Sequence, residues 1–478
     1  DSGAAGGPST CDGSLSPDVD GCVISDDYGV FVSPGGDDTT GDGTEAAPYA
    51  TLTTALAKLD AIKRIYVCAS EYAEPGTLEI PGGVSIYGGF GCDGGVWRYD
   101  PANNKTSFKP MSPIGAELNG AKGVTLQDLS IIAANATSPG GSSFGMTLVD
   151  SGAVLTRVKI RAGSGAIGTA GVDGVNGADG ADPTPMQNGH APVCVSPADN
   201  NGGLWAAPSD CSVRGGTGGT GYLSIAGDSG KTGVPLENIA TPGAQNGGAG
   251  ATTAGTLVPG TIGGTGSGGL SGATAASAKE IGSFSAAGYA VATGGDGTNG
   301  FAGQGGGGGG ASRGNGTACT GASGAAGGMG GCGGTLATGG KGGGGSIAVL
   351  SWNSSLTLVN SSLVASSGGA GGKGGKAGTG GAGKSGGQGG GVDTQHGVGA
   401  GGGGGSGGPG GNGGNGAGGT GGPSIALVYS MTEPAMDALS TLVPGTGGAA
   451  GVGGTYGNVN TKAPDGTLGV AKDKYVVP

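Results

Sequence analysis

Short hydrophobic runs recur along the chain, and each is followed by a long segment rich in glycine. Three copies can be aligned: 146–149 with 154–160, 346–350 with 356–359, and 424–428 with 439–443. The glycine-rich tracts after them begin near Gly163, Gly368 and Gly445. Repetition of one hydrophobic unit is typical of a solenoid whose coils stack on one another. The pattern predicts that the glycine tracts leave from the same corner of successive coils and lie side by side.

The region before the first copy has the pattern of one short helix and several strands. Residues from Leu52 to Leu59 carry hydrophobic side chains at helical spacing, which predicts a helix. Short β-forming runs at 65–68, 77–80 and 84–87 predict strands. The residues before Tyr28 are polar and rich in Pro, Gly and Asp, and are expected to form an N-terminal cap or tail.

Two motifs in this region resemble a known family of secreted proteins. Pro48 to Leu52 matches a Pro-x-x-Ser/Thr-[Ile/Leu] helix start, and Ile65 to Tyr72 matches a strand of the form Val-Tyr-Val-x-x-Gly/Ser-x-Tyr. Together, residues 28–165 resemble the start of the pectate-lyase-like superfamily, and are similar to glycine-rich surface proteins predicted in myxobacteria and related bacteria. The resemblance implies a mainly β fold, a right-handed parallel β-helix. It implies much less about activity.

Glycine recurs in a three-residue rhythm in the segment 368–422. Counting triplets from Gly368 to Gly391, glycine fills seven of eight first positions and seven of eight second positions. The return segment keeps glycine at every third residue from 401 to 422. A polyproline-II-type helix has three residues per turn and rises about 3.1 Å per residue, so this rhythm leaves bare stripes along it. The segment is therefore expected to form a hairpin of two glycine helices, each about 70 Å long.

Glycine-rich sequence has two other common structures, a flexible linker and a collagen triple helix. Such sequence is usually a flexible linker, because it has too little side chain to offset the entropy lost on ordering. Collagen is also three-periodic, but these triplets contain almost no proline and the chain folds back. In a bundle of glycine helices, neighbouring backbones satisfy each other's amide and carbonyl groups. We predict the bundle.

The tracts also resemble the polyglycine-II bundles of snow-flea antifreeze protein and of phage tail-tip adhesins, a resemblance of architecture only. The expected architecture is a right-handed parallel β-helix with an inserted polyglycine-II bundle. Seven segments follow: a stapled N-terminal segment (1–27), the first β-helix part with its capping helix (28–162), a glycine-rich insertion (163–345), a coil (346–367), a glycine hairpin (368–423), a coil (424–444), and a glycine-rich turn with a C-terminal strand (445–478).

Composition narrows the classes of partner. The chain has 126 glycines in 478 residues, 4% aromatic residues and a formal net charge of −12. A thinly spread negative charge without a basic patch argues against nucleic acid or an anionic membrane as partner. A run of about 18 apolar residues, which a membrane span needs, is missing from the sequence. The chain starts at Asp1, as though an export signal had been removed, although trimming for other reasons gives the same appearance.

Eight cysteines fall into four pairs of sequence neighbours: Cys11 with Cys22, Cys68 with Cys92, Cys194 with Cys211, and Cys319 with Cys332. An even count without Cys-x-x-Cys spacing predicts disulfides and an oxidising, extracellular or cell-surface location. The spacing does not determine the connectivity.

Candidate chemistry is sparse. Asp37, Asp38 and Asp42 form a weak Ca²⁺ candidate, for which ordinary turn and cap chemistry is the alternative. Asp12, Asp18 and Asp20 have calcium-type oxygen ligands without the full spacing of a calcium loop. The alternating residues Asp173, Asp179 and Asp182 are expected at a solvent-exposed edge, where they would keep a glycine helix soluble. No other cofactor is expected.

The basic residues carry no catalytic pattern. His190 and His396 are the only histidines, and both are expected in exposed loops. Arg157, Lys159 and Arg161 could serve a lyase, but they alternate with hydrophobic residues, as an outward-facing strand does. No catalytic residue is therefore assigned.

Three functions are compatible with these features of the sequence. The first is a non-enzymatic structural or adhesive protein, which could be a filament subunit that donates a strand at Tyr475, Val476 and Val477 to a second copy. The second is a polysaccharide-binding protein or lyase that uses the β-helix groove, for which Trp97, Trp205 and Trp352 are the only indole platforms. The third is ice binding, which requires a flat Thr/Ala/Val face. We predict the first of these functions.

Overall fold

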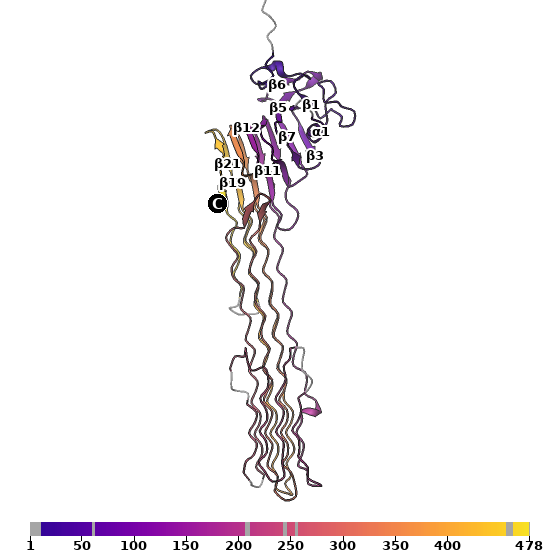
Figure 1. Ribbon diagram of the computed structural model, residues 1–478, viewed down its shortest axis with the longest axis vertical. Coiled ribbons are helices and arrows are strands. Elements are labelled where there is room, and N and C mark those ends of the chain that lie inside the picture. The colour runs from indigo at the N-terminus through magenta and orange to yellow at the C-terminus, as the bar shows by residue number, and fades with distance from the viewer. Residues whose placement is uncertain are drawn as a thin grey trace, which may run out of the picture.

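The computed structural model describes residues 11–59, 63–205, 211–241, 246–253, 257–455 and 462–477. The strands gather in a trunk at one end of the molecule, and the glycine-rich segments extend from the trunk as a long, narrow rod (Figure 1). The described part of the chain contains one α-helix, α1 (Leu52–Ala57), and three single-turn 3₁₀ helices. These are η1 (Gly21–Val23), η2 (Asp93–Gly95) and η3 (Pro185–Gln187).

Three sheets form the trunk, and we name them sheets A, B and C. Sheet A has the spatial order β1 (Val30–Val32), β2 (Arg64–Cys68), β5 (Ser85–Gly91), β9 (Val124–Gln127), β12 (Gly152–Thr156), β17 (Ser355–Val359) and β20 (Ala435–Met436). Sheet B has the order β21 (Thr441–Val443), β18 (Ser362–Val364), β13 (Lys159–Arg161), β10 (Leu129–Ile132), β7 (Thr106–Pro110) and β3 (Glu71–Glu74). Sheet C has the order β22 (Ala471–Val477), β19 (Ser424–Ser430), β16 (Ser346–Trp352), β11 (Ser143–Val149), β8 (Ile114–Asn119) and β4 (Leu78–Glu79).

The chain cycles through the sheets in the order A, B, C, so that each cycle forms one coil. Strands on this path pair in parallel with the coils before and after, and the short strand β6 (Arg98–Tyr99) pairs antiparallel with β5. The trunk is therefore mainly β, with the topology of a parallel β-helix. This confirms the expected fold class at that level.

Aliphatic side chains stack in register inside the trunk. Leu126, Leu155 and Leu358 are paired neighbours along sheet A, and all three are almost fully buried. Such stacking removes a continuous column of apolar surface from water, which is the main source of stability here. Helix α1 covers the N-terminal end of the column, where Leu52 and Ala55 are buried in the same core. Its N-cap is Thr51, whose side chain accepts a hydrogen bond from the Thr54 amide.

The predicted repeats are found in register, with one correction. Met146 pairs with Val349, and Val349 pairs with Leu427, as the three-copy alignment requires. In the third copy, however, residues 439–443 do not pair with 356–359, as the alignment had predicted. Residues Thr441–Val443 pair with Ser362–Val364 of sheet B, whereas β17 pairs with the short strand β20. The hydrophobic run at 439–443 therefore occupies the next position around the coil.

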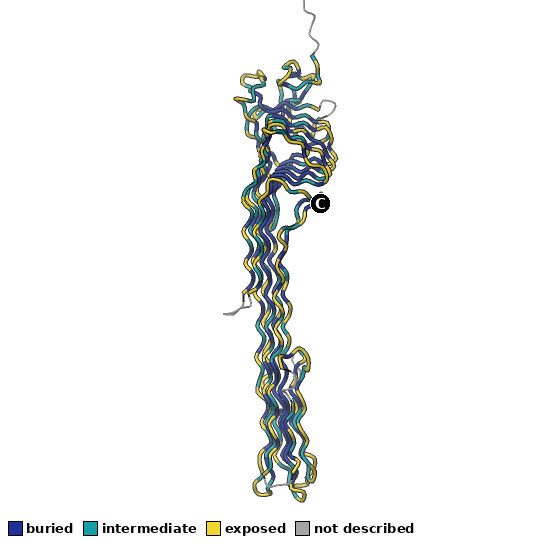
Figure 2. The backbone as a smooth tube through the Cα atoms, turned by 90° about the vertical axis from the view of Figure 1, so that its left-hand side faces the viewer, coloured by how far each residue is buried: buried dark blue, intermediate teal, exposed yellow. Residues whose placement is uncertain are grey.

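The long glycine segments leave the trunk at one corner. They connect β13 to β16, β18 to β19, and β21 to β22, and each of these connections runs from sheet B to sheet C. The prediction of a common corner is confirmed. Because consecutive coils are neighbours, the segments start next to one another and run down the rod side by side (Figures 1 and 2).

In the rod, backbone amides bond to neighbouring segments at three-residue intervals. Gly168, Gly171, Gly174 and Gly177 donate to the carbonyls of Ala370, Lys373, Lys376 and Thr379 in a parallel neighbour. An antiparallel pair of segments is joined in the same way: Gly297, Gly300, Gly303 and Gly306 donate to Ala337, Gly334, Gly331 and Gly328. The glycine segments are thus ordered by mutual hydrogen bonding.

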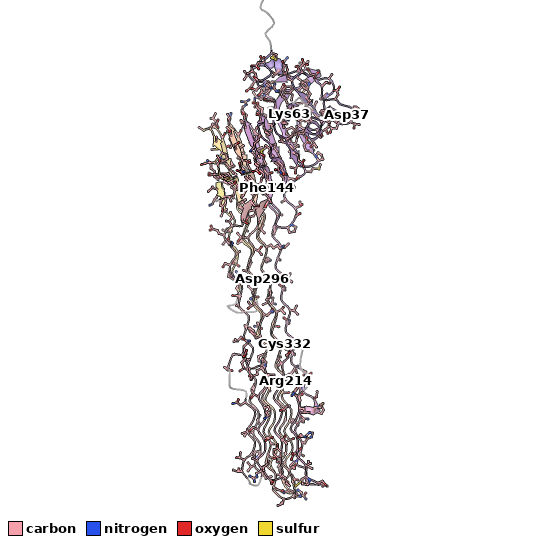
Figure 3. All side chains as sticks on the ribbon, viewed as in Figure 1. Asp37, Lys63, Phe144, Arg214, Asp296 and Cys332 are labelled. Atoms are coloured by element: carbon pink, nitrogen blue, oxygen red, sulfur yellow. A yellow bond between two sulfur atoms is a disulfide. The ribbon has the colours of Figure 1, made fainter. Side chains whose placement is uncertain are left out.

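A small hairpin joins the rod to the outer face of the trunk. It consists of β14 (Ser283–Ser285) and β15 (Gly288–Ala290), which belong to the first glycine-rich insertion. Phe284 of the hairpin packs with Phe144, Ile347 and Ile425 on the outer face of sheet C. Figure 3 labels Phe144 where the trunk meets the rod. The hairpin therefore covers an apolar surface that the coils leave exposed.

Candidate functional site

The disulfides staple the trunk and the rod separately. Cys11–Cys22 and Cys68–Cys92 form as sequence neighbours, but the other four cysteines pair as Cys194–Cys319 and Cys211–Cys332. The neighbour pairings of Cys194 with Cys211 and Cys319 with Cys332 are therefore wrong. In the rod, lateral position decides the partner: the Thr320 amide donates to the Val193 carbonyl, which places Cys319 beside Cys194. Four disulfides indicate an oxidising, exported environment.

Two histidines and two of these cysteines lie toward the end of the rod far from the trunk. The outward glycine segment from Gly368 ends in a turn in which the backbones of Asp393 and Val398 exchange hydrogen bonds. His396 lies in this turn, and its Nδ1 is 2.9 Å from Asp393 Oδ2. This hydrogen bond holds the pKa of Asp393 below its usual value.

The turn rests against the Cys194–Cys319 disulfide. Asp393 Oδ2 lies 3.4 Å from Cys194 Sγ, and His396 Nδ1 lies 3.7 Å from the same sulfur. His396 is exposed, Asp393 and Cys194 are half-buried, and Cys319 is buried. The interpretation of His396 as an ordinary loop histidine is therefore incomplete. Asp393 is its near neighbour in sequence, but Cys194 is about two hundred residues away along the chain, and no pattern in the sequence places it beside His396.

A shallow pocket lies nearby along the rod. It has a volume of about 460 Å³, and its lining includes Met186, His190, Leu204 and Thr217. Met186 and Leu204 expose 67% and 54% of their surface, so the lining of the pocket is partly apolar. Apolar walls around a few polar groups can hold a ligand, and this pocket is one concave feature of the rod.

On the trunk, a charged cluster surrounds Arg157. This residue follows β12 and has a φ of 54°, a left-handed conformation that arginine rarely adopts. Its Nε lies 2.7 Å from Asp128 Oδ1, and its Nη2 lies 3.3 Å from Asp18 Oδ2 and 3.2 Å from the Tyr99 hydroxyl. Arg157 thereby ties the N-terminal segment to sheet A.

Lys159 and Arg161 of β13 are exposed on either side of buried Ile160, as the alternation predicted.

Asp128 and Arg157 of this cluster also line a groove with a volume of about 640 Å³. Lys105 and Lys159 also line it, together with Asp128. Tyr99 is bonded to Asp128, and burial together with that hydrogen bond raises the pKa of Tyr99 to about 12. The Asp128 carboxylate is fully engaged by Arg157 and Tyr99, so it is poorly placed to abstract a proton.

The predicted calcium ligands are engaged in hydrogen bonds: Asp37 and Asp42 within their own turns, and Asp38 with the residues just before α1. Asp37 accepts hydrogen bonds from the amides of Thr39 and Thr40, and Asp42 accepts from Thr44. Asp38 accepts from the Thr51 hydroxyl and amide and from the Ala50 amide. Among the described residues, neither this trio nor Asp12, Asp18 and Asp20 forms a cluster able to hold a metal. Figure 3 places Asp37 at the outer side of the trunk, away from the rod.

The acidic residues along the first glycine segment have a structural role that the sequence interpretation missed. The side-chain oxygens of Asp173, Asn176 and Asp179 accept hydrogen bonds from the amides of Lys376, Thr379 and Ala382. Amides at the surface of the rod have no further backbone neighbour, so Asp and Asn replace the missing carbonyl. Their three-residue spacing was the available signal. Asp182 instead lies 3.2 Å from the Lys384 ammonium.

The indole platforms expected of a polysaccharide groove are dispersed. Trp97 is buried against Phe31, and Trp205 lies beside the Arg214 guanidinium. Trp352 is half-buried at the end of β16, next to the cluster beneath the hairpin. The three indoles therefore belong to three separate environments.

The predicted assembly strand is used within the chain. Tyr475, Val476 and Val477 belong to β22, which pairs in parallel with β19 in the register Val428 to Tyr475. Tyr475 also packs on Phe284 of the hairpin, with ring centroids 5.4 Å apart. Donation of this strand to a second copy would first require its release from β19.

Comparisons with known proteins give no relative. No family model, no curated protein and no solved structure matches the chain. Among the helices that the structure describes, none has the length and hydrophobicity needed to cross a bilayer.

Proposed function

We propose that this protein is a non-enzymatic extracellular structural or adhesive protein, in which a β-helix trunk displays a stiff rod of polyglycine-II helices. The rod has the properties of a spacer: it is narrow, and its two disulfides lie among the glycine segments. The trunk is the part with a hydrophobic core. A spacer of this kind holds the groups at its far end at a fixed distance from whatever anchors the trunk.

One observation carries this proposal. Six successive glycines, Gly305 to Gly310, are buried in the rod, and their amides donate in turn to three different neighbours. Gly305 and Gly308 donate to the segment at 231–234, Gly306 and Gly309 to the segment at 325–328, and Gly307 and Gly310 to the segment at 261–264. A helix with three residues per turn faces a new neighbour at every residue, which is the bonding expected of a polyglycine-II lattice.

The absence of side chains at these contacts explains the composition. A Cβ placed on Gly410 would lie 2.0 Å from the Cys332 carbonyl oxygen, and one on Gly378 would lie 1.9 Å from that of Val175. Such distances are far below van der Waals contact, so only glycine lets the backbones approach. The cost in chain entropy is high for glycine, and the dense hydrogen bonding offsets it.

Imaging and adhesion test the proposal together. Electron microscopy of the full chain is expected to show a trunk with one rod about 70 Å long, as a two-dozen-residue polyglycine-II segment requires. Beads coated with the protein are expected to be retained under flow on surfaces coated with cell-surface polysaccharide. Particles with a collapsed or variable rod, or beads retained no better than uncoated ones, would contradict the proposal.

Self-assembly is a separate part of the proposal. The last coil, formed by β20 to β22, is where a second copy would add. Lys474 stands in register with the core residue Leu427, however, and its Nζ bonds to Glu433 at 2.8 Å. A charge at an edge disfavours pairing with another chain. Concentration-dependent filaments in the micrographs would support assembly, whereas single particles at all concentrations would limit the protein to a monomeric spacer.

The groove at Arg157 favours polysaccharide binding as the second candidate function. Lys105 and Lys159 line the groove and could pair with uronate carboxylates. A lyase additionally needs a free base, and the nearby carboxylate Asp128 is engaged. Release of unsaturated uronate from pectin or alginate, measured with and without Ca²⁺, would establish the enzyme instead.

A further inference from the structure

Four metal-binding side chains converge at the far end of the rod. The ligand atoms of Cys194, Cys319, Asp393 and His396 all lie within 4.8 Å of one another, and they form the one such group among the described residues. They come from three different connections: the segment after the first glycine helix, the turn before Thr320, and the turn at 393–398. Their convergence is a product of how the glycine segments are packed.

The donor set suits zinc. Two thiolate sulfurs, one imidazole nitrogen and one carboxylate oxygen are ligands that Zn²⁺ takes in tetrahedral sites. In the oxidised protein the two sulfurs are bonded to each other, which leaves His396 and Asp393 bonded together beside them. Both partners needed to complete a four-ligand site are therefore already in contact with Cys194.

We propose that reduction of the Cys194–Cys319 disulfide converts the rod end into a Zn²⁺ site made of Cys194, Cys319, Asp393 and His396. Two equivalents of a low-molecular-weight thiol supply two electrons and two protons: the S–S bond breaks, two cysteine thiols form, and the external thiol becomes its disulfide. Zn²⁺ then binds both sulfurs as thiolates and displaces their two protons to solvent.

The oxidised form and the reduced, zinc-bound form cross-link the rod end differently. The disulfide joins Cys194 to Cys319 and leaves the turn at 393–398 held by weaker contacts. A metal ion would bind that turn as well, through Asp393 and His396. The reduced, zinc-loaded rod end would therefore hold all three connections together. In a reducing medium, the zinc ion would replace the disulfide as the cross-link and preserve the structure of the rod end.

Metal titration of the full chain tests the inference. Protein reduced anaerobically with a thiol, then freed of excess reductant, is expected to bind one Zn²⁺ per chain at this site, measured against a chromophoric chelator. Co²⁺ in place of zinc is expected to give the visible absorption of a tetrahedral thiolate site. The oxidised protein is expected to bind at least tenfold more weakly.

The two histidines provide a matched pair of variants. His396→Ala is expected to weaken zinc binding at least tenfold and to change the Co²⁺ spectrum, whereas His190→Ala, at the other histidine, is expected to behave as the parent chain. Equal binding by the His396→Ala and parent proteins would overturn the proposal, because the other reduced cysteines would then account for the metal. So would a reduced parent chain that binds no zinc. If reduction loosens the rod, hydrogen exchange in the 393–398 turn should be slowed by zinc in the parent and not in His396→Ala.

Discussion

At the scale of single residues, the rod depends on side chains that stand in for backbone carbonyls. Asn415 is the buried example: its Oδ1 accepts a 2.8 Å hydrogen bond from the Ala377 amide. Ala377 is the one place in the segment from Gly368 where a first-position glycine is replaced. The Gly380 amide in the same segment donates in the same way to Asn412 Oδ1, so the side-chain acceptor does not depend on the replaced glycine.

Asn415→Ala is expected to destabilise this part of the rod by about 1 to 3 kcal/mol, because it leaves the buried Ala377 amide without its acceptor. Hydrogen exchange measures the effect directly, as faster exchange at Ala377. Gln388→Ala, which removes an exposed side chain from the same glycine segment, is the control and is expected to leave that exchange unchanged. Equal protection of Ala377 in the Asn415 variant and the parent would show that the side chain is dispensable.

Because backbones of neighbouring glycine segments approach closely, alanine should be tolerated at some glycine positions of the rod and not at others. Gly410→Ala should destabilise the rod by at least about 1 to 3 kcal/mol, because its Cβ would overlap the Cys332 carbonyl. Gly391→Ala has open space around the added carbon and should be neutral, or up to about 1 kcal/mol stabilising. Urea unfolding monitored by protease resistance compares the two. A similar midpoint for both variants would argue that the rod tolerates side chains at its contacts.

At the scale of elements, the hairpin β14–β15 is the least expected feature. Phe284 is 7% exposed and packs between Tyr289 and Tyr475, and it covers the outer face of sheet C. The sequence at this point reads as a connector between glycine segments, since the run has only a few large apolar residues. Its packing partners belong to strands far away in sequence.

Phe284→Ala is expected to cost about 3 to 5 kcal/mol of local stability, because a large buried ring is lost. The hairpin should then become sensitive to limited proteolysis between Ser283 and Ala290, and β22 should loosen with it, since Tyr475 loses its neighbour. Phe301→Ala, which truncates an aromatic side chain that is 43% exposed, is the control. Unchanged resistance of the hairpin in the Phe284 variant would contradict its role as a cover.

At the scale of the whole molecule, the carboxyl groups that accept hydrogen bonds decide how acid is expected to act on the trunk and the rod. Hydrogen bonds from Ser440 and from the Asn360 amide lower the pKa of Asp437 below its usual value. For Asp38, burial raises the pKa, but hydrogen bonds from Thr51 and Ala50 outweigh it and the net shift is downward. A carboxyl whose pKa is lowered by folding stabilises the native state above its unfolded pKa, about 3.9, and that stability is lost as the pH falls through the folded pKa.

Thermal unfolding should therefore be independent of these carboxylates between pH 7 and pH 5, and should weaken below about pH 4. Most hydrogen bonds along the rod join backbone groups, which do not titrate in this range. The losses should therefore be concentrated at the trunk turns that hold Asp38 and Asp437 and, in the rod, at Asp393, whose pKa is also lowered. Hydrogen exchange at pH 3, read separately for trunk and rod, locates the change. Loss of stability that starts above pH 5 would implicate other groups.

The sequence by itself determined the local rules of this protein. The recurrence of hydrophobic runs fixed the coils and their common corner, and the three-residue glycine rhythm fixed which faces of each segment are bare, since both follow from periodicity along the chain. Lateral neighbours were decided by the tertiary structure alone. Cys194 meets Cys319, Asn415 meets Ala377, and His396 meets Cys194 because of the way the segments are arranged around one another. Segments made of the same glycine triplets present nearly identical surfaces, so their sequences contain little information about which of them become neighbours.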